Sequence, residues 1–98
     1  PADDGTMLEQ KNVTAFKTSG LTFCGSNFNY SIRVYRSMIQ VNLGGVWRTA
    51  RADAQGRLDS GEFTNIRNNQ KYRIAGDMAQ RAFNVENLTS LCAWRATF

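Results

Sequence analysis

The side chains that most often perform chemistry in proteins are scarce in this sequence. It has no histidine and only two cysteines, Cys24 and Cys92, which lie far apart and form no Cys-x-x-Cys spacing. A transition metal would lack its usual ligand set, so we expect no metal and no cofactor. A disulfide is the favoured interpretation; it implies an oxidising compartment and would contribute roughly 4 kcal/mol by closing a long loop. Two buried free thiols are the alternative.

Cationic side chains are frequent in the second half of the chain, where aromatic residues alternate with them. The set comprises Arg48, Arg51, Arg57, Arg67, Lys71, Arg73 and Arg81, interleaved with Trp47, Phe63 and Tyr72. This mixture suits phosphate contacts combined with base stacking. The candidate RNA-binding residues are Arg48, Arg51, Lys71, Tyr72 and Arg73. The competing interpretation is that the three aromatic residues are core residues of short strands.

Length and charge limit the organisation of the chain. With 98 residues and a net charge of +4, it is expected to form one domain with a cationic surface. Residues 1–11 are polar and predict a flexible N-terminal arm, followed by a single domain over 12–98. No apolar run approaches membrane-spanning length. No signal peptide is recognised, so Pro1 is expected to be a mature terminus left after cleavage.

Three Asn-x-Ser/Thr sequons are present, at Asn12, Asn29 and Asn87. They fit secretion, but the composition alone predicts about 1.3 such sites by chance. The sequons therefore do not establish glycosylation.

The elements that must position these side chains follow from the hydrophobic pattern. Residues 12–24 alternate in polarity and predict two short strands or a hairpin. In the segment 31–43, Ser31 suits an N-cap and Gly44-Gly45 a helix end. The expected helical stripe consists of Ile32, Tyr35, Met38 and Ile39. Val34 and Val41 are β-branched and lie off this stripe, which argues against the helix.

Beyond Gly45 the sequence reads as short strands joined by polar turns. One helix followed by strands predicts an α+β domain, in which a single α-helix packs on an antiparallel β-sheet preceded by an N-terminal hairpin or arm.

Several segments resemble the secreted fungal guanyl-specific ribonucleases. The stretch FCGSNFNYS at 23–31 is similar to their opening strand and turn, and GEFTNI at 61–66 to the strand that carries their catalytic glutamate. This resemblance places Glu62 at the general-base position. KYRIAG at 71–76 resembles the next strand and places Arg73 at the phosphate-binding position. Cys92 resembles the late cysteine that pairs with the cysteine of the opening strand, and the domain is expected to be ribonuclease-like.

The resemblance does not extend to catalysis. The general acid of that family is a histidine, and this chain has none. Glu62 and Arg73 are therefore interpreted as vestigial active-site residues, with a structural ion pair as the alternative. The chain is similar to the ribonuclease-like effectors that powdery mildew fungi secrete, which have about a hundred residues, an early aromatic-and-cysteine motif, a late cysteine and no catalytic histidines.

This resemblance implies a function without an enzymatic step. We expect a non-catalytic, monomeric virulence effector that is secreted and then acts in the cytoplasm or nucleus of plant host cells. Its expected partners are host RNA, ribosomes or proteins, including a plant immune receptor that detects it. No membrane partner is expected.

Two alternatives belong to other classes. GGVW at 44–47 and LCAW at 91–94 resemble fragments of bacterial enterotoxin B subunits, which are small disulfide-linked barrels that bind receptors as rings. An active ribonuclease would use Glu62 as the base and, once protonated, as the acid.

Overall fold

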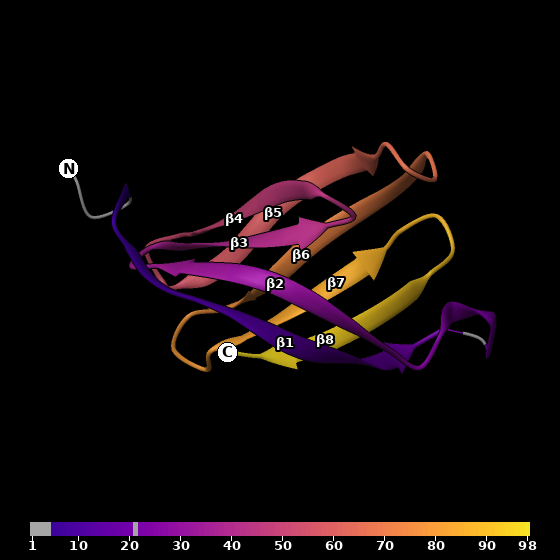
Figure 1. Ribbon diagram of the computed structural model, residues 1–98, viewed down its shortest axis with the longest axis horizontal. Helices are drawn as coiled ribbons and strands as arrows, with labels where there is room; N and C mark the ends of the chain where they lie inside the picture. Colours follow the sequence, from indigo (N-terminus) through magenta and orange to yellow (C-terminus); the bar gives the residue numbers. More distant parts are fainter. Residues whose placement is uncertain (1–4, 21) are drawn as a thin grey trace.

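The structure is a computed structural model that describes residues 5–20 and 22–98, and these form a closed antiparallel β-barrel (Figure 1). Each strand pairs with its neighbours in the chain, and β1 pairs with β8 to close the barrel. The strands are β1 (Met7–Ser19), β2 (Asn27–Tyr35), β3 (Met38–Leu43), β4 (Val46–Ala52), β5 (Arg57–Asn65), β6 (Gln70–Asp77), β7 (Ala82–Asn87) and β8 (Cys92–Thr97). A 3₁₀ turn, η2 (Thr22–Cys24), lies between β1 and β2.

The expectation of an α+β domain is wrong, because the described residues contain no α-helix. The segment expected to be the helix is the hairpin of β2 and β3, in which Ile32 pairs with Val41 and Val34 with Ile39. These four side chains are fully or almost fully buried inside the barrel, so the alternation of β-branched residues was the correct signal. The barrel therefore replaces the ribonuclease-like scaffold.

The turn between β2 and β3 explains the error. It runs through Arg36 and Ser37 and contains no Gly, Pro, Asn or Asp to mark it in the sequence. The inward-facing residues of β2 and of β3 lie on either side of this turn. When the segment is read as one continuous element, residues from both strands happen to have the spacing of a helical stripe.

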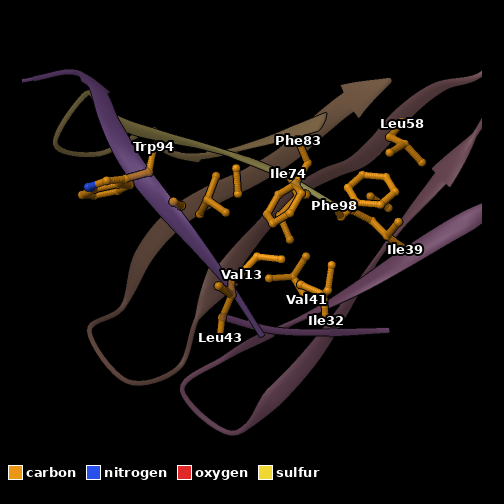
Figure 2. Packing of buried hydrophobic residues seen from close by; sticks show 14 of the residues in the cluster. Val13, Ile32, Ile39, Val41, Leu43, Leu58, Ile74, Phe83, Trp94 and Phe98 are labelled. Carbon is orange, nitrogen blue, oxygen red and sulfur yellow. The ribbon is translucent and has the colours of Figure 1, made fainter. Parts of the chain in front are cut away.

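Hydrophobic side chains fill the inside of the barrel (Figure 2). They alternate along each strand with outward-facing polar residues, as the two-residue period of a strand requires. The largest fully buried side chains are Phe83, Ile32, Ile39, Ile74, Val34, Val41 and Val85. A filled interior places any ligand site at an end or on the outer wall of the barrel.

One end, here called the closed end, carries the turns 36–37, 53–56 and 78–81 together with Phe98 (left in Figure 1). Phe98 is buried and packs against Phe83, with ring centroids 6.1 Å apart. The Arg81 Nε donates a hydrogen bond of 2.9 Å to the Phe98 main-chain oxygen, and its guanidinium lies over the Phe98 ring. This contact seals the barrel at that end.

The residues expected to form the flexible arm divide into two groups. Residues 1–4 lie outside the described part of the chain, whereas Met7–Lys11 are the first residues of β1. Within this segment Glu9 accepts a 2.8 Å hydrogen bond from Arg81, which connects β1 to the closed end.

The disulfide between Cys24 and Cys92 is confirmed. It joins η2 to the first residue of β8 across a sequence separation of 68 residues, with the Cα atoms 5.8 Å apart. Gly20 lies against it with a φ of +110°, and a Cβ at this position would meet the Cys24 Sγ at 2.5 Å. A disulfide of this kind is compatible with a secreted protein.

Candidate functional site

The end opposite Phe98, here called the mouth, is formed by Gly20 and the segments 22–26, 44–45, 66–69 and 88–91 (right in Figure 1). Aromatic side chains line it because they occupy the strand positions that face the inside of the barrel. Tyr30 lies two residues before buried Ile32, and Tyr72 two residues before buried Ile74. Phe28 packs edge-on against Trp94, with ring centroids 4.9 Å apart.

Two adjoining hollows open at the mouth and share Phe28, Tyr72 and Trp94. One has a volume of about 150 Å³ and reaches Tyr30, and the other has about 210 Å³ and reaches Phe23. A cavity of about 150 Å³ holds a benzene ring, whereas drug-sized ligands need about 300 Å³ or more. Each hollow therefore has room for a single ring of a larger ligand.

The mouth offers hydroxyl groups to such a ring. The Ser90 Oγ beside the larger hollow is buried and has no hydrogen-bond partner among the described residues. Burial, together with the neighbouring Tyr72, raises the pKa of Tyr30 above its ordinary value. The Tyr30 hydroxyl therefore stays protonated at neutral pH and can donate a hydrogen bond.

Amide side chains hold this end of the barrel in place. Asn87 is buried; its Nδ2 donates to the Gln70 Oε1 at 2.7 Å, and its Oδ1 accepts from the backbone amides of Thr89 and Ser90. Asn68 Nδ2 donates to the Tyr72 hydroxyl at 3.0 Å. These bonds hold the β7–β8 turn and the Tyr72 side chain in place. They also occupy the Asn87 amide nitrogen, which is the atom that glycosylation of this sequon would modify.

Arginines bridge a gap in the barrel wall at the mouth. Strands β4 and β5 pair only at Arg51–Asp59 and Ala52–Leu58, near the closed end, so they separate toward the mouth. Arg48 crosses the gap, donating to the Thr64 carbonyl at 3.1 Å with its guanidinium over Phe63.

Arg67 makes the second bridge by donating to the Gly44 carbonyl at 3.3 Å. Gly44 has a φ of +64°, and a Cβ there would meet the Arg67 Cδ at 2.3 Å. The positive φ thus favours glycine at this position, and a larger residue would also displace the Arg67 side chain.

The charge at the mouth is mainly positive, although Glu62 lies beside Lys71 and Glu86 beside the β7–β8 turn. The turns of the mouth and the strand residues that flank them, 22–31, 42–48, 63–72 and 87–94, contain Arg48, Arg67 and Lys71 and no Asp or Glu. The mouth thus combines aromatic rings and amides with three cations, a composition that suits an anionic ligand with planar groups.

The structure brings some of the RNA-binding candidates together and separates the others. Arg48, Lys71 and Tyr72 lie around the mouth. Arg51 is exposed on the outer wall of β4 near the closed end, and Arg73 lies on the outer wall of β6.

Glu62 and Arg73 face each other across β5 and β6, but Arg73 binds another carboxylate. Its Nε donates to the Asp59 Oδ1 at 3.0 Å, and its Nη2 donates to Asp59 Oδ2. The Arg73 guanidinium, and next the Gly61 backbone amide, lower the pKa of Asp59 from 3.8 to about 2. This ion pair on the outer wall was not expected from the sequence.

The other two sequons face each other on β1 and β2. Thr14 Oγ1 donates to the Asn29 Oδ1 at 2.7 Å, and Ser31 Oγ donates to the Asn12 Oδ1 at 2.8 Å. Each sequon supplies the hydroxyl that binds the asparagine of the other, because the register pairs Asn12 with Ser31 and Thr14 with Asn29. A structural role thus accounts for both motifs.

Sequence reasoning missed Phe23, Phe28, Tyr30, Ser90 and Trp94 as site residues. The signal that could have found Trp94 and Tyr30 is the two-residue period, which places them on the inward face once the buried neighbours are known. No pattern indicates that four turns distant in sequence meet at one end, because that follows from barrel closure.

No protein-family model matches this sequence, and no curated protein or solved structure is detectably similar to it. Over the described residues, no three His, Cys, Asp or Glu side chains gather in an arrangement that could hold a metal ion. No helix in the described part of the chain is long and apolar enough to cross a bilayer.

Proposed function

We propose that this protein is a secreted, non-catalytic binding protein that holds single-stranded RNA at the mouth of its barrel. The observation that carries the proposal is the pair of ring-sized hollows beside Phe28 and Tyr72, whose own lining has no charged residue and whose surroundings carry Arg48, Arg67 and Lys71. Bases stack on aromatic side chains irrespective of sequence, at about 1–3 kcal/mol per base. The rim cations attract the phosphates that flank a stacked base.

The rim residues retain donors for phosphate. A guanidinium has five N–H donors, and the contacts of Arg48 and Arg67 with main-chain carbonyls use a single nitrogen of each. Lys71 is exposed beside Glu62, Phe63 and Thr64. The two arginines are thereby held in place before a ligand arrives, which reduces the entropy lost on binding.

The proposal includes the absence of catalysis. Cleavage of RNA needs a base for the ribose 2′-hydroxyl and an acid for the leaving oxygen. The residues that line the two hollows include no carboxylate, and the chain has no histidine. A protonated Tyr30 is not a base at neutral pH.

The host role stays a prediction. The resemblance to powdery mildew effectors drew on a scaffold that the barrel replaces, so the disulfide and the mouth are what now support a secreted binder. Action inside plant cells and detection by an immune receptor would require that the same protein reaches host RNA.

The test is a titration of a fluorescently labelled eight-nucleotide oligouridylate with wild-type protein and single variants. Phe28→Ala should weaken binding by about 5- to 150-fold, the equivalent of one lost stacking contact. The matched aromatic control is Phe16→Ala, since Phe16 is exposed on the outer wall of β1. Lys71→Ala should weaken binding and reduce its salt dependence, whereas Arg73→Ala, which removes the same charge from the pair with Asp59, should not.

Equal losses in Phe28→Ala and Phe16→Ala would overturn the assignment of the mouth. Binding of a neutral oligosaccharide at the mouth, independent of salt and without binding of RNA, would replace RNA as the ligand. Shortened RNA products made by wild-type protein and absent from the buffer control would refute the non-catalytic part.

A further inference from the structure

The amide side chains around the mouth use their oxygen atoms to hold the turns of the barrel. The Asn65 Oδ1 accepts a hydrogen bond of 3.0 Å from the backbone amide of Arg67. The Asn68 Oδ1 accepts one of 3.1 Å from the backbone amide of Gln70. A backbone N–H only donates, so these contacts determine which end of each side-chain amide is the oxygen. The nitrogen of each amide, which only donates, is the group left for other contacts.

The same orientation passes from Asn87 to Gln70. The Asn87 Oδ1 accepts from the backbone amides of Thr89 and Ser90, so the Asn87 Nδ2 is the group that donates to the Gln70 Oε1. The Gln70 oxygen is thereby occupied. The Gln70 Nε2 and the Asn65 Nδ2 have no partner among the described residues, and both remain free to donate.

The hydroxyl groups of the mouth add to these donors. The Tyr72 oxygen accepts from the Asn68 Nδ2 at 3.0 Å, which leaves the phenolic hydrogen to donate. The Tyr30 hydroxyl beside the smaller hollow can donate or accept, as can that of Ser90 beside the larger one. None of these groups requires a donor on the ligand.

The free donors are divided between the two hollows. Asn65 lines the smaller hollow and Gln70 the larger one, while Tyr72 lines both. All three side chains are half-buried, so they keep surface that a ligand can reach. The lining of both hollows has no charged residue. A ring that enters either hollow therefore meets neutral N–H and O–H donors and has to present acceptors to them.

We infer that the mouth selects uracil among the RNA bases. Cytosine, adenine and guanine each carry an exocyclic amino group that donates hydrogen bonds, whereas the corresponding substituents of uracil are carbonyl oxygens. The Asn65 and Gln70 amides donate to these oxygens. An amino group in the same place would face a donor and stay unpaired, which weakens binding. This inference rests on the proposed function, which it narrows from stacked bases of any sequence to strands that contain uracil.

The test compares labelled octamers of uridylate and cytidylate, whose bases have the same ring size but differ at the amino group and the adjacent ring nitrogen. Wild-type protein should bind the uridylate about 5- to 150-fold more tightly, the range for reading one base edge. Asn65→Asp and Gln70→Glu each exchange a donor for an acceptor of the same shape and keep the oxygen that the fold uses. Each should lower the ratio of the two affinities.

Both changes also add a negative charge, so the matched control is Asn42→Asp. Asn42 precedes the Gly44-Gly45 turn and does not line either hollow, and its Oδ1 accepts from the Gly45 amide as the aspartate would. This control should weaken both octamers equally. Tyr72→Phe keeps the ring, removes the hydroxyl donor and adds no charge; it should lower the ratio too, and it provides the answer where an acidic variant fails to fold.

The outcomes separate this inference from the proposed function. Equal binding of the two octamers by wild-type protein would overturn the selection of uracil and keep RNA at the mouth. A ratio that falls as far in Asn42→Asp as in Asn65→Asp and Gln70→Glu would assign the effect to charge and overturn the role of the two amides. No binding of either octamer would overturn the proposed function together with this inference.

Discussion

The two ends of the barrel are built from the same strands but differ in how their side chains are packed and hydrogen-bonded. At the closed end Phe98 is 7 % exposed, and Arg81 satisfies both the main-chain oxygen of Phe98 and the carboxylate of Glu9. At the mouth Phe28 is 43 % exposed, and the buried Ser90 hydroxyl has no partner among the described residues. The closed end is packed and paired, whereas the mouth leaves rings and cations exposed and one buried hydroxyl without a partner among the described residues.

The difference shows where stability and binding are located. Four of the seven large hydrophobic side chains that are exposed in the described residues belong to the mouth, namely Phe23, Phe28, Ile66 and Leu91. Exposed apolar groups contribute little to folding, and their clustering at one end is typical of an interaction site. Loops on a rigid barrel commonly carry function for this reason.

Removing the disulfide should have the largest effect on stability, because the bond joins η2 to β8 at the mouth. Replacing both cysteines, Cys24→Ser with Cys92→Ser, should cost roughly 4 kcal/mol, since the reduced chain regains the entropy of a long loop. That loss corresponds to a fall in Tm of well over ten degrees, measurable by circular dichroism. A Tm within three degrees of wild type would mean that the mouth does not depend on the bond.

Truncating one phenylalanine at each end compares the ends directly. Phe98→Ala should lower the free energy of unfolding by about 3 kcal/mol, because it removes a buried ring from the seal of the barrel. Phe28→Ala should cost less than about 1.5 kcal/mol, since almost half of that side chain is already in water. Urea denaturation measures both. A greater loss from Phe28→Ala would reverse the comparison and make the mouth the more tightly packed end.

The smallest effect concerns the paired charges on the wall. Because the pKa of Asp59 falls from 3.8 to about 2 on folding, the pair stabilises the protein above about pH 4 and loses that contribution as the pH falls through about 2. In Arg73→Ala the pKa of Asp59 should rise toward 3.8. Both side chains are more than 40 % exposed, so the change in stability at neutral pH should be the smallest of those predicted here.

The carboxyl carbon of Asp59, followed by NMR from pH 1.5 to 6, gives the two titration midpoints. An unchanged midpoint in Arg73→Ala would show that Arg73 does not hold Asp59. Binding of RNA at the mouth should be the same in the variant, since the pair lies on the outer wall.

The disulfide could be predicted because two cysteines without a metal-binding spacing or a histidine leave few other roles, and most of the short strands after Gly45 because polar turns are local signals. The prediction of a helix over 31–43 was wrong. Ile32, Tyr35, Met38 and Ile39 have helical spacing although they belong to two strands. Val34 and Val41 carried the contrary signal, but a turn made of Arg36 and Ser37 gave no reason to divide the segment. A local pattern cannot reveal such a division when the turn lacks its usual residues.

The site was less predictable than the fold. Arg48, Lys71 and Tyr72 were named as candidates and do surround the mouth, but Arg73 was grouped with them although it binds Asp59. Asp59 faces Ala75 and so lies diagonally across from Arg73, while a β-bulge between Asp59 and Glu62 places Glu62 directly opposite Arg73. Neither the bulge nor the meeting of four turns at one end is encoded over a short stretch of sequence.

The order of the strands has a consequence for how the chain folds. Seven of the eight strand pairings join neighbours along the chain and can form one hairpin at a time, with short loops to close. Only the pairing of β1 with β8, which extends over Phe16–Arg95, Lys17–Trp94 and Ser19–Ala93, requires distant parts of the chain to find each other. This non-local step should limit the folding rate. The Cys24–Cys92 bond lies beside the same seam, so oxidation before folding would spare the chain most of that search.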